Sequence, residues 1–260
     1  MADSVVDARR AYLMFESLGD HWGMGMAAMG VGQWEAGRGG QEADVWLTRA
    51  MDHLTLIGAV QDARTVLVVR ELRRALLGSA DALSVLTHVA RSSSSSSQER
   101  AHALLGLGMV AARAGRWDDC LRHAEEGVAV AHADAGLSAQ ARIMAEVTAA
   151  VLTTRGGGDG RPLLELAAET SLRTADMPVL GFVALGHAEL AAARGDVGRA
   201  QELWALGTRL GADLSMLFGA SVPGEPTDVL GTPDERATML REVHQRPIVD
   251  ARNRVAALLG

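Results

Sequence analysis

The feature that most limits how this chain can fold is a turn that recurs about every forty residues and is usually marked by glycine. The turn residues align at Arg38, Gly78, Gly115, Gly158 and Gly195, in steps of 40, 37, 43 and 37 residues. Five positions after each turn stands a small or apolar residue, and twelve positions after it a small one. Since these offsets fall on one face of a helix, the pattern predicts five helix–turn–helix pairs.

A single pair of this size cannot bury its own apolar face, whereas about three or more stacked copies can. The sequence therefore predicts an all-α array. Residues 1–19 supply only the second helix of a preceding pair, since AYLMFESLG at 11–19 repeats the pattern of AMDHLTLIG at 50–58. This start in mid-repeat suggests a piece of a longer protein.

The array is expected to occupy residues 1–211 and to be followed by a proline-containing linker and C-terminal capping helices at 212–260. Pro233 and Asp234 mark a helix start, and Pro247 marks a break within the last segment. The six consecutive serines at 92–97 indicate a flexible loop between helices more than a phosphorylation switch.

The third pair resembles the tetratricopeptide family at a set of signature positions, although the large aromatics of that family are mostly replaced by Ala or Gly. This resemblance implies a right-handed superhelical solenoid of tetratricopeptide-like helical hairpins. The matching residues are Leu104, Leu107, Gly108, Ala111, Cys120, Ala124 and Gly127.

A narrower resemblance is to the repeats of large actinobacterial transcriptional regulators, of the antibiotic-regulatory and LuxR-type ATPase classes. It rests on the helix end MFESLGD at 14–20, on WGMGMAAMGVG after it, and on the tail AQELWALGTRLGADL at 200–214. The resemblance implies that the chain is the regulatory arm of such a protein, whose DNA-binding and nucleotide-binding domains lie elsewhere.

Composition excludes several functions. All 25 basic residues are arginine, so the chain has neither a phosphate-loop lysine nor a Schiff-base lysine. A net charge of -7 argues against direct nucleic-acid binding by this chain. Cys120 is the single cysteine, no signal peptide is evident, and no apolar run is long enough to span a membrane, so a cytoplasmic protein is expected.

Motifs that carry chemistry are weak, and we expect no enzyme, no cofactor and no metal. Two dinucleotide-like GxGxxA matches, at 23–28 and 106–111, lie in predicted helices, where close helix packing explains the glycines better. His123, Glu126 and His132 come nearest to a metal set but lack ligand spacing. Cys120 stands at a repeat position typical of a buried thiol.

The tetratricopeptide resemblance implies that partners bind along the first helices of the pairs. The inward positions carried over are Val68, Leu72 and Ala75 in the second pair, His102, Leu105, Met109 and Arg113 in the third, and Phe182, Leu185 and Glu189 in the fifth. This mostly apolar lining suits a helix or a small apolar ligand. The basic cluster Arg70, Arg73 and Arg74 could dock a carboxylate or phosphate, or form a solvated helix face.

The sequence thus predicts a non-catalytic protein-interaction or signal-sensing module, the regulatory arm of a bacterial transcriptional regulator. Two alternatives stay open: a stand-alone scaffold that binds a peptide or helix, and a small-molecule-binding module with an effector in the groove. The uncovered face of the first helix, with Tyr12, Phe15 and Leu18, also predicts homo-oligomers through the N-terminal repeat edge.

Overall fold

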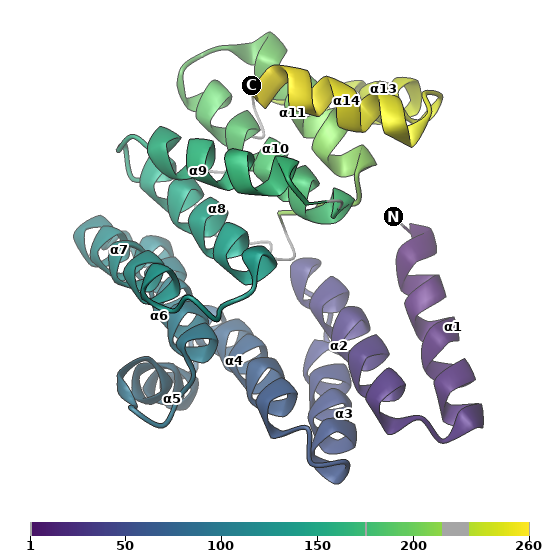
Figure 1. Ribbon diagram of the computed structural model, residues 1–260, viewed down its shortest axis with the longest axis vertical. Helices are drawn as coiled ribbons and strands as arrows, with labels where there is room; N and C mark the ends of the chain where they lie inside the picture. Colours follow the sequence, from purple (N-terminus) through teal and green to yellow (C-terminus); the bar gives the residue numbers. More distant parts are fainter. Residues whose placement is uncertain (1, 175, 215–228, 260) are drawn as a thin grey trace. The chain divides into compact units, whose positions relative to one another are not determined.

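The chain is all-helical, as the periodicity predicts. The structure, a computed structural model, describes residues 2–174, 176–214 and 229–259, and these form thirteen α-helices and no strand (Figure 1). None of the described helices is long and apolar enough to cross a membrane.

A lone helix, α1 (Ala2–Leu18), precedes five helix pairs. Every first helix has 17 residues, whereas the second helices vary from 12 to 17. The pairs are α2 (His21–Gly37) with α3 (Ala43–Leu56), α4 (Val60–Leu76) with α5 (Ala80–Arg91), α6 (Ser97–Arg113) with α7 (Trp117–Ala133), α8 (Ala139–Arg155) with α9 (Arg161–Leu172), and α10 (Met177–Ala193) with α11 (Val197–Arg209).

A glycine in the left-handed region closes the first helix of every pair. The φ angles are 70° at Gly39, 96° at Gly78, 73° at Gly115, 84° at Gly157 and 76° at Gly195. In the third pair, for example, the Gly115 N–H donates to the Ala112 carbonyl and the Arg116 N–H to the Ala111 carbonyl, both at 2.9 Å. These two hydrogen bonds satisfy the last carbonyls of the helix. Glycine adopts the required left-handed conformation without steric strain because it has no Cβ atom.

Two of the predicted turn residues were wrong by one position. Gly39 takes the place predicted for Arg38, whose φ is -102°, and Gly157 takes the place predicted for Gly158. Buried positions shift similarly in the fourth pair, where Leu164 rather than Leu163 is fully buried. The longer glycine-rich turn before α9 accounts for that shift.

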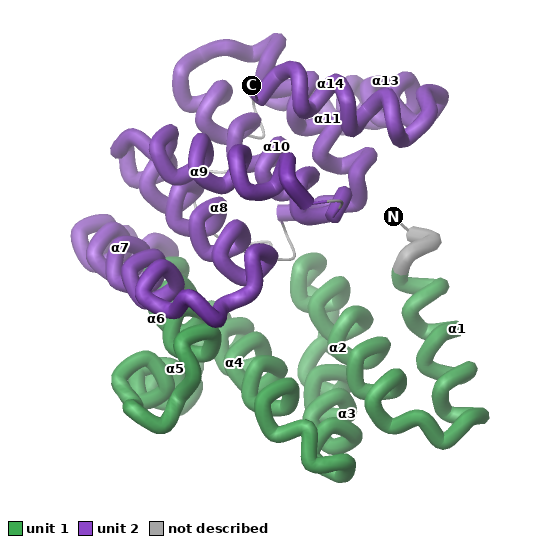
Figure 2. Tube along the Cα trace, in the orientation of Figure 1, with its two compact units in different colours: residues 1–110, 215–221 green, residues 111–214, 222–260 purple. Residues whose placement is uncertain are grey.

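Two compact units make up the described chain, and each has its own core (Figure 2). The first runs to Val110, and its core lies among α1 to α4, with Val31, Leu47 and Leu54 fully buried. The described part of the second comprises residues 111–214 and 229–259, and its core includes Leu203 and Leu206 of α11.

The C-terminal helices α13 (Pro233–His244) and α14 (Ile248–Leu259) pack against α11 within the second unit. Thr232 and Glu235 form a capping box that begins α13, as the Pro233 signal predicts. The predicted break at Pro247 falls between the two helices. Most of the predicted linker, residues 215–228, lies outside the described residues.

Glycine also sets how closely helices approach. A Cβ on Gly207 of α11 would lie 2.7 Å from the carbonyl oxygen of Gly181 on α10, and a Cβ on Gly181 would lie 2.8 Å from that of Gly207. Both contacts are to backbone, which cannot move aside as a side chain can. The two helices can therefore cross at this distance only with glycine at both positions.

We expect Gly207→Ala to destabilise the second unit by about 1 to 3 kcal/mol, because the added methyl group forces α10 and α11 apart. Gly198→Ala in the same helix is the matched control, since a Cβ there meets no atom within 4 Å. Its effect should be neutral or slightly stabilising, by under about 1 kcal/mol. Urea unfolding followed by circular dichroism measures both, and equal stabilities for the two variants would contradict this packing.

Candidate functional site

The first helices do not present the lining that the sequence predicts. On α6, Leu105 and Met109 are buried, His102 is half-buried, and only Arg113 is exposed. In the structure this leaves little of α6 open to a partner.

The predicted positions on α10 and α4 are similarly closed. Leu185 and Glu189 are buried on α10, and Phe182 is half-buried. Val68 and Ala75 are buried on α4. The reason is that a first helix is covered on several sides: α10 packs against α8, α9 and α11, and its residues 188–192 are all buried.

Glu189 has an internal partner that sequence spacing does not reveal. The guanidinium of Arg155, at the end of α8, donates from Nη2 to the Glu189 Oε1 at 2.7 Å and from Nε to the Oε2 at 3.1 Å. Both side chains are almost fully buried. The pair joins α8 to α10 as a bidentate ion pair, so this carboxylate is not an open contact for a ligand.

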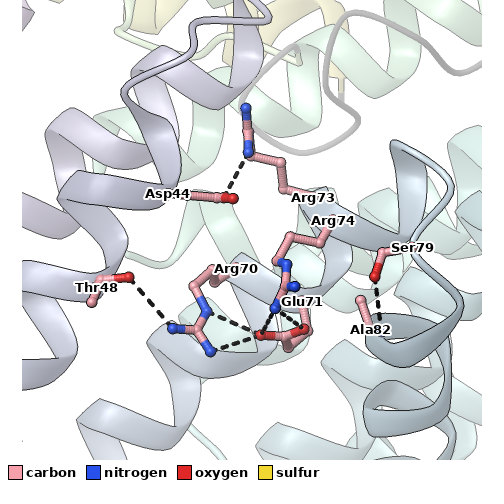
Figure 3. Close-up of polar contacts among 8 residues, drawn as sticks. All are labelled: Asp44, Thr48, Arg70, Glu71, Arg73, Arg74, Ser79 and Ala82. Atoms are coloured by element: carbon pink, nitrogen blue, oxygen red, sulfur yellow. Dashed lines mark hydrogen bonds and ion pairs between the residues drawn. The ribbon is translucent and has the colours of Figure 1, made fainter.

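Arg70 and Arg74 of α4 both contact the buried carboxylate of Glu71 (Figure 3). Arg70 donates from Nε and Nη2 to the Glu71 Oε1 at 3.0 and 2.8 Å, and the Arg74 Nη1 lies 3.3 Å from both Glu71 oxygens. Arg73 instead donates to the Asp44 Oδ1 of α3 at 2.6 Å and to the Gly40 carbonyl in the turn before α3 at 3.0 Å. An external carboxylate or phosphate would therefore compete with Glu71 for Arg70 and Arg74.

Replacing Glu71 tests whether this network is structural. We expect Glu71→Gln to lower the free energy of unfolding by about 2 kcal/mol or more, because two arginines lose the buried charge that they share. That figure is reduced from the fully buried case because the Arg74 side chain is 41% exposed. Thermal unfolding at neutral pH is the measurement.

Glu169→Gln is the matched control, since it removes an ion pair to Arg173 of 2.7 Å in which both side chains are over 60% exposed. Such a surface pair contributes little, and no measurable change is expected. A Glu71→Gln protein that unfolds with the same midpoint as the control would contradict a structural network.

The dinucleotide-like segments, His132 and Cys120 all lie in packed helices. The two dinucleotide-like segments fall within α2 and α6, and a Cβ on Gly25 would lie 2.7 Å from the Leu54 Cγ. The His132 Nε2 lies within hydrogen-bonding distance, 2.8 Å, of the Oε1 of the buried Glu146. No group of three potential metal ligands occurs among the described residues. Cys120 is fully buried, and burial raises the pKa of its thiol to about 11.

His187 gives a direct test of burial in the second unit. Burial on α10 lowers the pKa of its imidazole to about 4, partly opposed by a hydrogen bond to the Leu164 backbone. The unfolded chain, with a pKa near 6.5, therefore binds a proton that the folded chain does not. Its contribution to stability is present above pH 6.5 and declines as the pH falls toward 4.

We expect the His187 ring signals in an NMR titration to stay at their neutral positions down to pH 5. We also expect His187→Gln to reduce the loss of stability between pH 6.5 and 4. Titration of this ring near pH 6.5 would contradict its burial.

The inner face of α1 is firmly attached to the first unit. Val5, Arg9 and Tyr12 recur at helical spacing, and Val5 belongs to the core. The Arg9 Nη2 lies 2.9 Å from Glu35 and 3.0 Å from Glu42. The Tyr12 ring packs edge-on against Trp46 at 5.4 Å between centroids, and its hydroxyl lies 3.0 Å from the His53 Nε2.

The outer face of α1 carries four exposed apolar side chains among polar ones. Its exposed fractions are 61% for Val6, 62% for Leu13, 59% for Met14 and 75% for Leu18. Of the face predicted for self-association, only Leu18 is exposed: Tyr12 and Phe15 are half-buried, Phe15 beside Gly23. Among the described residues, nine of the fourteen exposed large hydrophobic side chains lie in the first 60 positions, so this concentration is a feature of one end of the chain.

Three later second helices are covered by other helices on more than one side. Helix α3 packs against both α2 and α4, α9 against both α8 and α10, and α11 against α10, α13 and α14. Helix α1 occupies the same place relative to α2, but within the described part of its unit no helix covers its other side. This unpartnered face is the candidate functional site.

Comparisons of the chain with family models, with curated proteins and with solved structures found no significant match. The site is therefore interpreted from its own geometry.

Proposed function

We propose that the chain is a non-catalytic helical-repeat module that binds an amphipathic helix of a partner protein on the outer face of α1. The observation that carries this proposal is the exposed stripe of Val6, Leu13, Met14 and Leu18 on a helix otherwise anchored in a core. Exposed apolar side chains gathered on one side of a helix are typical of interaction sites.

A helix is the occupant that the repeat pattern favours. Second helices α3 and α9 each lie against a first helix on two sides, so the uncovered side of α1 corresponds to a position that a helix fills elsewhere. The chain itself fills the corresponding position at α11 with α13 and α14. The bound helix would thus repeat a packing that this sequence already uses.

The chemistry of the face defines the partner further. Leu13 and Met14 offer the adaptable apolar contact that helix-in-groove recognition uses, with anchors on the partner at positions i, i+3, i+4 and i+7. Asp7 and Arg10 are exposed among these apolar side chains and Glu16 beside them, so the face carries both signs of charge. A partner helix with apolar residues on one face and mixed charges at its edges fits this surface.

The proposal also covers the stacking of the helix pairs and the protein to which the module belongs. We propose that the pairs stack as a right-handed, tetratricopeptide-like solenoid and that the module is the regulatory arm of a bacterial transcriptional regulator in the cytoplasm. Support for the stacking is the constant 17-residue first helix and the repeated glycine turn. Support for the regulatory role is the sequence resemblance alone, and sequencing of the reading frame around this chain tests it.

A peptide copy of α4, residues 60–76, is a suitable probe for the α1 face because α4 already packs against a second helix in the chain. We expect the labelled peptide to bind the full chain in a fluorescence anisotropy titration. Leu13→Glu and Met14→Glu should each weaken binding by about tenfold or more, because a charge would replace an apolar contact. A peptide carrying Val66→Glu, which alters its buried face, should not bind.

Leu77→Glu is the matched control, since Leu77 is 64% exposed in the same unit but lies outside α1. Equal peptide affinity for all three protein variants would contradict the proposed site. Sedimentation velocity of the chain alone distinguishes the other occupant: a dimer abolished by Leu13→Glu would show that a second copy, rather than a partner helix, covers α1.

A further inference from the structure

A second candidate site lies within the first unit, away from α1. A cavity of about 160 Å³ opens between α4, α5 and the six-serine loop. Its apolar wall is formed by Leu67, Val68 and Val89, and its polar side chains include Arg64 and Glu99. This volume is below the roughly 300 to 1,000 Å³ of typical ligand pockets, so the cavity has room only for a very small molecule.

The serine loop, which its composition predicts to be flexible, is hydrogen-bonded to α4 in the structure. Gln61 of α4 donates from Nε2 to the Ser96 Oγ at 2.6 Å, and the Arg64 Nη1 lies 3.4 Å from the Ser94 carbonyl oxygen. Within the loop, the Ser92 and Ser94 hydroxyls are 2.8 Å apart. Short polar side chains therefore fasten the loop to α4 and to itself.

Glu99 provides the polar group that most needs a partner. Its residue is 2% exposed, and its Oε2 accepts the Ser96 N–H at 3.2 Å while the Ser96 Oγ accepts the Glu99 N–H at 3.2 Å. This capping box uses one carboxylate oxygen. The other, Oε1, is buried with no hydrogen-bond partner among the described residues. A buried acceptor left unsatisfied costs free energy that a donor from a ligand would recover.

The positive charge nearest in the cavity lining, that of Arg64, forms no ion pair with Glu99. Arg64 is an exposed residue of the same lining, and its Nη1 is hydrogen-bonded to the Ser94 carbonyl oxygen at 3.4 Å. No ion pair within 4 Å joins it to Glu99 or to another acidic group among the described residues. The lining of the cavity thus combines Glu99, of which one carboxylate oxygen is buried without a partner, Arg64, which is hydrogen-bonded to the Ser94 carbonyl, and an apolar wall. A molecule that carries an ammonium group, a carboxylate group and an aliphatic side chain would complement all three.

We propose that this cavity binds a small aliphatic amino acid, with its ammonium group donating to Glu99, its carboxylate on Arg64 and its side chain against Leu67, Val68 and Val89. This site is independent of the α1 face and of the proposed partner. It makes the module responsive to a metabolite as well as to a protein.

Isothermal titration of the full chain with valine and two truncated analogues tests the zwitterion requirement. Isobutylamine retains the amine without the carboxylate, and 3-methylbutanoate retains the carboxylate without the amine. We expect valine to bind and each analogue to bind at least about tenfold more weakly, since each lacks one charge-assisted contact.

Protein variants assign the two charges. Glu99→Gln keeps a side chain that can serve the capping box but removes the carboxylate, and it should weaken valine binding by about tenfold or more. Arg64→Gln should do the same. Arg91→Gln is the matched control, because Arg91 is exposed at the end of α5 and does not line the cavity. Unchanged unfolding midpoints confirm that the variants are folded.

Three results would overturn the proposal. One is the absence of binding by valine, alanine, leucine and isoleucine at millimolar concentration. Another is equal affinity for valine and isobutylamine, which would leave Arg64 without a role. The third is valine affinity unaffected by Glu99→Gln. None of these results bears on peptide binding to α1, so the two proposals fail or succeed separately.

Discussion

A first helix that ends on a left-handed glycine is the constraint on which the rest of this structure depends. Because the glycine N–H and the N–H that follows it both fold back onto the helix, the last carbonyls are satisfied and the chain reverses within a few residues. In the pairs α2 with α3 and α10 with α11, the second helix packs on the first and buries small residues such as Ala43 and Ala200. Glycine also allows the close contact of α10 and α11 at Gly181 and Gly207. The two backbones approach there because neither residue has a side chain.

The sequence predicts the helix pairs well because a glycine turn and a 3.6-residue period are local signals. The turns at Gly78, Gly115 and Gly195 and the helix break at Pro247 were predicted correctly. Arg38 was wrong by one residue, since alignment by spacing does not consider which of two neighbours adopts a positive φ.

Most of the predicted binding residues are buried in the structure. Sequence patterns did not reveal this, because burial depends on the neighbouring helices and is not a local property. Leu105, Met109 and Leu185 lie on helices that several others cover, and spacing within one helix does not reveal how many neighbours it has. The Arg155–Glu189 ion pair, which spans α8 and α10, also leaves no pattern in the sequence. The exposed face of α1 could be predicted only in outline: the lone second helix was evident, but Tyr12 and Phe15 turn inward while Leu13 and Met14 face outward.

The account centres on the open face of α1, and oxidation of Met14 tests it most directly. Brief exposure of the folded chain to hydrogen peroxide, followed by peptide mass spectrometry, ranks each methionine by access to solvent. The account predicts that Met14 oxidises far faster than Met24 and Met109, which are 4% exposed, and that the α4 peptide slows Met14 selectively. Slow oxidation of Met14 in the free chain would show that the face is already covered and would contradict the account.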